Sequence, residues 1–180
     1  MRRRTHPLRR GVAAIELGFV TMLFVVPLII GIWEVGRLIQ VQQIVANSAR
    51  EGARLAAQGF TIRSDGTQVQ IRKESGTPNV KDAVVDYLRA SGLTTLTAAD
   101  VTVTFEFTAP KTTAPDIGTY PPEPYLGEKG QPFTVHVSVP WNKVRWINIG
   151  LLGPSDVHFT VTWHMLRDEV FSVNTTLPTW

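Results

Sequence analysis

An apolar stretch near the N-terminus limits what this chain can fold into. It runs from Val12 to Trp33, about 22 residues, and contains one charged residue, Glu16. A helix rises 1.5 Å per residue, so the stretch would be about 33 Å long, enough to cross the hydrocarbon core of a bilayer. The sequence therefore predicts a transmembrane helix that anchors the remainder of the chain.

The arginines before this stretch predict its orientation. Five arginines precede it, whereas Arg37 is the nearest basic residue after it. Because positively charged residues stay on the cytoplasmic side, we expect a single-pass protein of the cytoplasmic (inner) membrane. Its N-terminus would be cytoplasmic and its C-terminal domain extracytoplasmic. Pro27 lies within the stretch and removes a backbone hydrogen bond, which predicts a kink or local unwinding near Phe24 to Pro27.

The charge balance and the lack of cysteine exclude several classes of protein. The formal net charge of +3 comes from the arginines before the helix: without those five, 13 Lys and Arg stand against 15 Asp and Glu. A nucleic-acid partner is therefore not expected. The chain has no cysteine, so it has neither a disulfide framework nor a thiol nucleophile.

The segment before the apolar stretch is open to two interpretations. A secretory signal peptide is disfavoured, because its apolar core has about 7–15 residues and is followed directly by a small-residue cleavage site. A short basic leader that ends at Gly11 and is cut on the cytoplasmic side is the arrangement of type IV pilins, and Glu16 stands at the fitting distance. The alternative is an uncut signal anchor, in which Gly11 is incidental.

The helix is predicted to continue beyond the membrane as far as Gln58. No proline interrupts 34–58, and Gly59 is a suitable C-terminal stop. Its later half carries two rows of small residues that would let a helix or sheet approach closely. These rows are Ser48, Gly52 and Ala56, and Ala49, Ala53 and Ala57. At i, i+3 spacing we expect two ion pairs, Glu34 with Arg37 and Glu51 with Arg54.

Two motifs on this helix, together with Gly11 and Glu16, resemble those of a known family. The motifs are Trp33-Glu34-Val35-Gly36-Arg37 and Ala49-Arg50-Glu51-Gly52-Ala53-Arg54. Over residues 9–58 the chain is similar to TadE-like proteins, the pseudopilins or minor pilins of the tight-adherence (Flp, type IVb) pilus. Leu17 differs from the family pattern, which often has an aromatic residue after the glutamate.

The resemblance implies a processing site and a set of partners. A prepilin peptidase would cut between Gly11 and Val12, and Glu16 would neutralise the new N-terminal amine of a neighbouring subunit. The implied partners are the prepilin peptidase, other pilins or pseudopilins of the Tad system, the inner-membrane assembly platform and the membrane itself. The matching motif residues are Glu34, Gly36, Arg37, Arg50, Glu51, Gly52 and Arg54.

The C-terminal part is predicted to be a small α+β domain. Asp65-Gly66 marks a turn, 67–73 is ambiguous between strand and helix, and a helix is expected from Thr77-Pro78 to Gly92. Three strands follow with period-two alternation: Val101–Phe107, Phe133–Val139 and Val157–Met165. The expected fold is pilin-like, with a long N-terminal transmembrane helix packed on a small antiparallel sheet. The expected units are leader 1–11, membrane helix 12–33, helix extension 34–58 and domain 59–180.

Two connections within this domain have more than one interpretation. Ala109 to Pro132 contains six prolines and is either an exposed, mobile loop or a contact surface. Trp141 to Leu152 mixes Trp with Lys and Arg, which is typical of a membrane–water interface, but it also fits an edge segment packed on the core.

We find no residues that predict an enzyme. His136, His158 and His164 fall on the polar faces of expected strands, where solvated histidines are commoner than metal ligands. A phosphate-binding or dinucleotide-binding glycine motif is missing from the sequence. We therefore expect no catalytic residue, metal or cofactor. The predicted function is a pseudopilin or minor pilin in pilus assembly; the alternative is an uncut, signal-anchored surface binding or scaffold protein.

Overall fold

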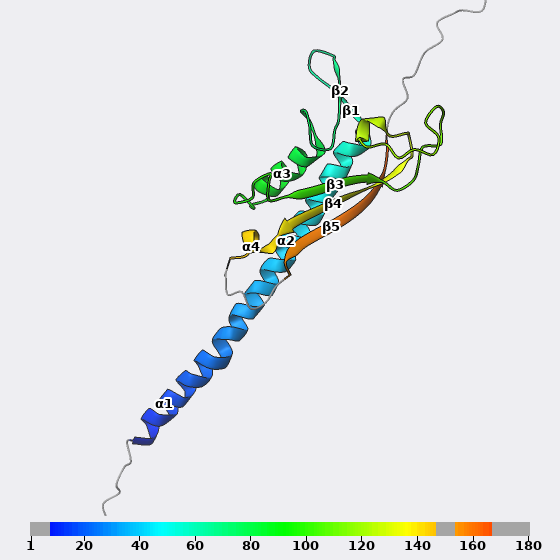
Figure 1. Cartoon of the computed structure of the whole chain (residues 1–180). Coiled ribbons are helices and arrows are strands. Elements are labelled where there is room, and N and C mark those ends of the chain that lie inside the picture. The colour runs from blue at the N-terminus through cyan, green and yellow to red at the C-terminus, as the bar shows by residue number, and fades with distance from the viewer. Residues whose placement is uncertain (1–7, 147–153, 167–180) are drawn as a thin grey trace, which may run out of the picture.

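The computed structural model describes residues 8–146 and 154–166, and its main feature is one long N-terminal helix (Figure 1). Helix α1 (Leu8–Val20) leads into a π-helical segment, η1 (Thr21–Val25), and then into α2 (Val26–Gln58). At the end of η1 the Val26 N–H donates to the Thr21 carbonyl, five residues back. Because Pro27 has no N–H to donate, the helix widens just before it. The predicted local unwinding is thus present, slightly ahead of the expected position.

Helix α2 ends where the sequence predicts, at Gly59. This residue has a φ of 68°, a conformation that glycine adopts without strain, and its N–H donates to the Ala56 carbonyl over 3.1 Å. A hairpin of β1 (Phe60–Ile62) and β2 (Gln68–Gln70) follows. Its turn contains Asp65, whose carboxylate accepts the Thr67 N–H at 2.9 Å. The ambiguous segment 67–73 therefore contains a strand.

The next helix, α3 (Val80–Ala90), begins later than predicted. The expected start at Thr77-Pro78 is wrong, because Asn79 is the N-cap: its side-chain oxygen accepts the Asp82 N–H at 2.7 Å. Pro78 thus lies before the cap instead of in the first turn. At the other end the helix stops at Ala90, close to the predicted Gly92.

Three antiparallel strands form the main sheet, and all three match the predicted strands to within one or two residues. They are β3 (Thr102–Phe107), β4 (Pro132–Pro140) and β5 (Asp156–His164), arranged in the order β3-β4-β5. Phe105 lies opposite Val135, which lies opposite Val161 on β5. The apolar face of this sheet packs against α2 and α3, as Figure 1 shows. The fold is therefore α+β, with the predicted pilin-like arrangement.

The small residues of α2 allow α3 and the sheet to pack closely against it. Ser48, Ala49, Gly52 and Ala53 are all buried. A Cβ placed on Gly52 would lie only 2.6 Å from Cγ2 of Val84 on α3, closer than ordinary contacts allow. The predicted small-residue rows thus form the seam between the long helix and the domain.

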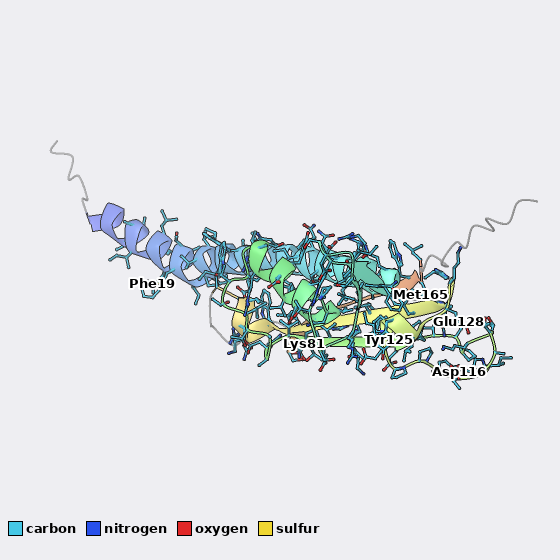
Figure 2. All side chains as sticks on the ribbon, turned by 90° about the horizontal axis from the view of Figure 1, so that it is seen from above. Phe19, Lys81, Asp116, Tyr125, Glu128 and Met165 are labelled. Atoms are coloured by element: carbon cyan, nitrogen blue, oxygen red, sulfur yellow. The ribbon has the colours of Figure 1, made fainter. Side chains whose placement is uncertain are left out.

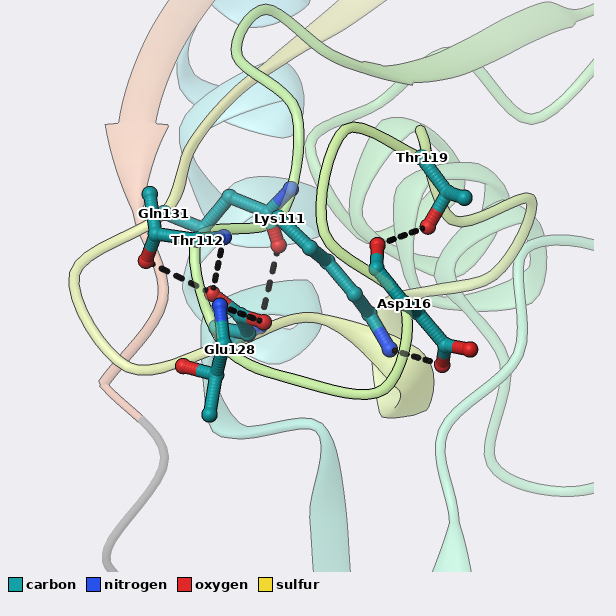
Figure 3. Close-up of polar contacts among 7 residues, drawn as sticks. Lys111, Thr112, Asp116, Thr119, Glu128 and Gln131 are labelled. Carbon is teal, nitrogen blue, oxygen red and sulfur yellow. Dashed lines mark hydrogen bonds and ion pairs between the residues drawn. The ribbon is translucent and has the colours of Figure 1, made fainter.

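The connection between β3 and β4 has a hydrogen-bonded structure of its own. It includes the short 3-10 helix η2 (Pro124–Leu126). Glu128 accepts backbone N–H groups from Thr112 at 2.8 Å and Thr113 at 3.0 Å, and Lys111 pairs with Asp116 at 3.2 Å (Figure 3). The N–H of Thr112 is the main reason why the pKa of Glu128 is lowered. Whether this connection contacts a partner stays a prediction.

The connection between β4 and β5 begins with a short helix, α4 (Trp141–Val144). Trp141 and Val144 are buried in the core. This confirms the packed-edge interpretation for the first part of Trp141–Leu152. Trp146, by contrast, is exposed, and residues 147–152 of the predicted segment lie outside the described residues.

Candidate functional site

The N-terminal part of the long helix exposes its apolar side chains. Among the described residues, Gly11–Gln58 is the one helix long and apolar enough to cross a membrane; its most apolar window has a mean hydropathy of 2.4, and none of that window is buried. Phe19 is 72% exposed and lies on the part of the helix that projects beyond the domain (Figure 2). The first buried residue of the helix is Val41. The helix before it therefore requires an apolar environment from outside this chain.

Gly11, Val12 and Glu16 lie together on α1, and all three are exposed. Val12 and Glu16 are one helical turn apart, so they lie on the same side of the helix. Within the described part of the chain, no residue forms an ion pair or hydrogen bond with the Glu16 carboxylate. A carboxylate on an apolar membrane helix is costly without a cationic partner. Such a partner would have to come from another molecule or from the N-terminus.

In the first motif the predicted pair of Glu34 with Arg37 is wrong. The Arg37 guanidinium donates to the Val144 carbonyl and to the Gln40 side chain, each at 3.0 Å, and lies 4.9 Å from the centroid of the Trp146 ring. Val144 is the last residue of α4, so its carbonyl has no partner within that helix. Burial lowers the pKa of Arg37. The Arg37 guanidinium is therefore engaged by a backbone carbonyl, the Gln40 side chain and an aromatic face, and not by Glu34.

Glu34 is consequently left without a partner in the described residues. Its Oε2 atom is buried, and no described group donates a hydrogen bond to it. The neighbouring Trp33 packs edge-to-face on Trp146, with 5.9 Å between ring centroids. This motif thus connects the exposed apolar part of the helix with the residues that follow α4.

The second motif divides between the core and solvent. Ala49, Gly52 and Ala53 face the core, whereas Arg50 and Arg54 are exposed. The predicted pair of Glu51 with Arg54 is confirmed: it is bidentate, with distances of 2.9 and 2.6 Å. The hydrogen bond from Arg54 is the main reason why the pKa of Glu51 is lowered. In this structure the motif acts chiefly by packing the helix on α3 and the sheet.

A groove of about 580 Å³ runs along the free edge of β3, and it was not predicted from the sequence. Besides the strand, it is lined by Lys73, Glu74 and residues 120–122. The Thr108 N–H donates to the Pro132 carbonyl, so Thr108 and every second residue before it direct their backbone groups toward β4. The backbone N–H and C=O groups of Val103, Phe105 and Phe107 therefore point away from β4, to the free edge.

Two of the predicted strand histidines lie next to each other on the sheet. His136 and His158 lie side by side on the polar face of the sheet, 5.7 Å between ring centroids, and His136 shares a hydrogen bond with Thr160. Among residues 8–146 and 154–166, no group of three or more His, Cys, Asp or Glu side chains could hold a metal ion.

Comparisons with known proteins agree with the motifs of the long helix. Residues 11–54 match the family model of the TadE-like protein. The match contains both motifs, Gly11, Glu16 and the whole exposed apolar stretch. Searches of curated proteins and of solved structures found no match. The chain therefore carries a TadE-like family domain at residues 11–54.

Proposed function

We propose that this protein is a pseudopilin or minor pilin that takes part in assembling a tight-adherence (Flp, type IVb) pilus. A TadE-like domain implies association with the Tad pilus machinery. The observation that carries the proposal is the division of one helix into two parts. Its N-terminal part is apolar and exposed, and its C-terminal part forms the core of a small α+β domain. This division suits a subunit that is stored in a membrane and later packed helix to helix.

The proposed location is the cytoplasmic membrane, crossed once by residues 12–33. The arginines before the helix would keep the N-terminus in the cytoplasm. Residues 34–58 would then leave the membrane as the stem of the extracytoplasmic domain, 59–180. The burial pattern supports this division, because every residue from 12 to 28 is exposed and burial in the core starts at Val41.

Processing would convert the N-terminus into a cationic partner for Glu16. A prepilin peptidase cuts between Gly11 and Val12, and Val12 then bears a free ammonium group. In a low-dielectric environment an unpaired ammonium and an unpaired carboxylate are both costly, and each gains by pairing with the other. The Glu16 of one subunit thus meets the Val12 amine of a neighbouring pilin, with the inner-membrane assembly platform bringing the subunits together.

Intact mass tests the processing step directly. The chain is expressed with and without a prepilin peptidase of a Tad system, as wild type, Gly11→Val and Gly18→Val. Gly18 is a matched control, since it lies on the same helix and, like Gly11, has no atom within 4 Å of an added Cβ. We expect wild type and Gly18→Val to lose residues 1–11 and Gly11→Val to stay intact. An unchanged wild-type mass would favour the uncut, signal-anchored scaffold instead.

A further inference from the structure

Three side chains meet where the exposed part of the long helix reaches the domain. Trp33 and Arg37 come from α2, and Trp146 follows α4, more than a hundred residues later in the chain. The Trp33 and Trp146 rings pack edge-to-face at 5.9 Å, and the Arg37 guanidinium lies over the Trp146 ring at 4.9 Å. We call Trp33, Arg37 and Trp146 the junction cluster.

The junction cluster leaves a large aromatic surface uncovered. Trp33 is 55% exposed and Trp146 is 60% exposed, although they contact each other. If packing on the helix were the only role of Trp146, the ring would be buried as Trp141 is, at 2%. The uncovered rings are continuous with the exposed apolar surface of the helix, where Ile29 and Ile32 are 55% and 66% exposed. A patch of this kind indicates a further apolar partner.

The position of the cluster along the helix points to the membrane surface. From Trp33 to Val41, the first buried residue of the helix, an α-helix rises about 12 Å. The headgroup layer on each side of a bilayer is about 5–8 Å thick. With Trp33 at the end of the membrane segment, Trp146 is at headgroup level and the domain core lies just beyond it.

The chemistry of the cluster fits the same level. Tryptophan concentrates at membrane–water interfaces, because its ring is apolar while its N–H needs a polar partner. Arg37, which lies over the Trp146 ring, supplies a cation at the level of the lipid headgroups. Two aromatic rings and one cation therefore stand together at the depth where headgroups and acyl chains meet.

We propose that Trp146, at the end of α4, is a second membrane contact of this protein and lies among the lipid headgroups beside Trp33. This inference rests on the proposed membrane anchorage by residues 12–33. Two separate contacts, one from the helix and one from the β4–β5 connection, restrict the tilt of the domain over the bilayer. The groove along β3 thereby takes a fixed direction relative to the membrane surface.

Tryptophan fluorescence of the full chain in lipid vesicles tests this contact. The vesicles contain phosphatidylglycerol and a phosphatidylcholine that carries bromine near the carbonyl end of its acyl chains, which quenches only nearby tryptophans. Three matched variants are compared with wild type: Trp33→Phe, Trp146→Phe and Trp163→Phe. Trp163 is a suitable control, since it is 38% exposed near the far end of β5. Each substitution keeps an aromatic ring, and circular dichroism checks that each variant is folded.

Substituting a membrane-contacting tryptophan and substituting a distant one are expected to change the quenched fraction of the total tryptophan emission in opposite directions. Trp33→Phe and Trp146→Phe each remove a quenched fluorophore and lower the fraction, whereas Trp163→Phe removes an unquenched one and raises it. If Trp146→Phe raises the fraction as Trp163→Phe does, the second contact is overturned while the anchor stands. If Trp33→Phe also raises it, the membrane anchorage of the proposed function fails as well.

Discussion

Adding one methyl group at Gly52 tests the packing that joins the long helix to the domain. In Gly52→Ala the new Cβ would lie 2.6 Å from Cγ2 of Val84 and 3.4 Å from Cγ1 of Val80. Both valines are fully buried, and a valine in a helix has essentially one side-chain rotamer, so neither can move away at low cost. Overpacking of this kind costs about 1–3 kcal/mol.

The helix propensity of alanine opposes this cost, so the sign of the change in stability shows which of the two effects is larger. Alanine is favoured over glycine in a helix interior by about 1 kcal/mol. Taking the upper half of the overpacking range, because the contact is so short, leaves a net loss of about 1–2 kcal/mol. For a chain of this size each kcal/mol shifts the Tm by about 2–4 °C, so we expect a fall of about 2–8 °C.

The assay is thermal unfolding of the full chain in detergent micelles, followed by circular dichroism. Gly36→Ala is the matched control on the same helix, since an added Cβ there meets nothing within 4 Å. It should leave the Tm unchanged or raise it. Combining Gly52→Ala with Val84→Ala removes the clashing methyl, so the pair should lose less than the sum of the single losses. A Gly52→Ala protein as stable as wild type would refute the close packing of α3 on α2.

Three further substitutions test other parts of the structure. Glu16→Gln keeps the size of the side chain but removes its charge, so membrane insertion should persist while cross-linking to partner pilins falls; wild-type cross-linking would argue against pairing with the Val12 amine. Asn79→Ala removes the N-cap of α3 and should cost about 0.5–2 kcal/mol in the unfolding free energy. The pKa of Glu128 is lowered in the folded protein, so its stabilising effect is present above the unfolded pKa and is lost as pH falls through the folded pKa. The protection of the Thr112 and Thr113 amides, measured as hydrogen exchange relative to the intrinsic rate at each pH, should therefore fall in acid in the wild type, whereas in Glu128→Gln it should not depend on pH in this way.

Elements with a regular pattern could be predicted from the sequence. The strands around Phe105 and Val135 alternate strictly, because one face of the sheet packs on the helices and the other meets water. The end of α2 at Gly59 and the small-residue rows follow equally local rules. The start of α3 was misplaced because Pro78 fits a first helical turn, yet the side chain of Asn79 caps the helix one residue later.

Features that depend on distant residues could not be predicted in this way. Arg37 binds the Val144 carbonyl, 107 residues away in sequence, so only the folded chain shows why it does not pair with Glu34. The groove along β3 likewise requires 73–74, the strand and 120–122 to come together. Trp146 was placed by composition in either the core or the membrane interface; the fold separates it from Trp141, which is buried.

Counting pili on cells that lack this protein tests the proposed role in pilus assembly most directly. The gene is deleted in its host, and pili per cell are counted by electron microscopy after complementation with wild type, Gly18→Val or Gly11→Val. We predict that deletion abolishes or strongly reduces piliation, that wild type and Gly18→Val restore it, and that Gly11→Val does not. A normal number of pili on the deletion strain would contradict the proposed role in pilus assembly.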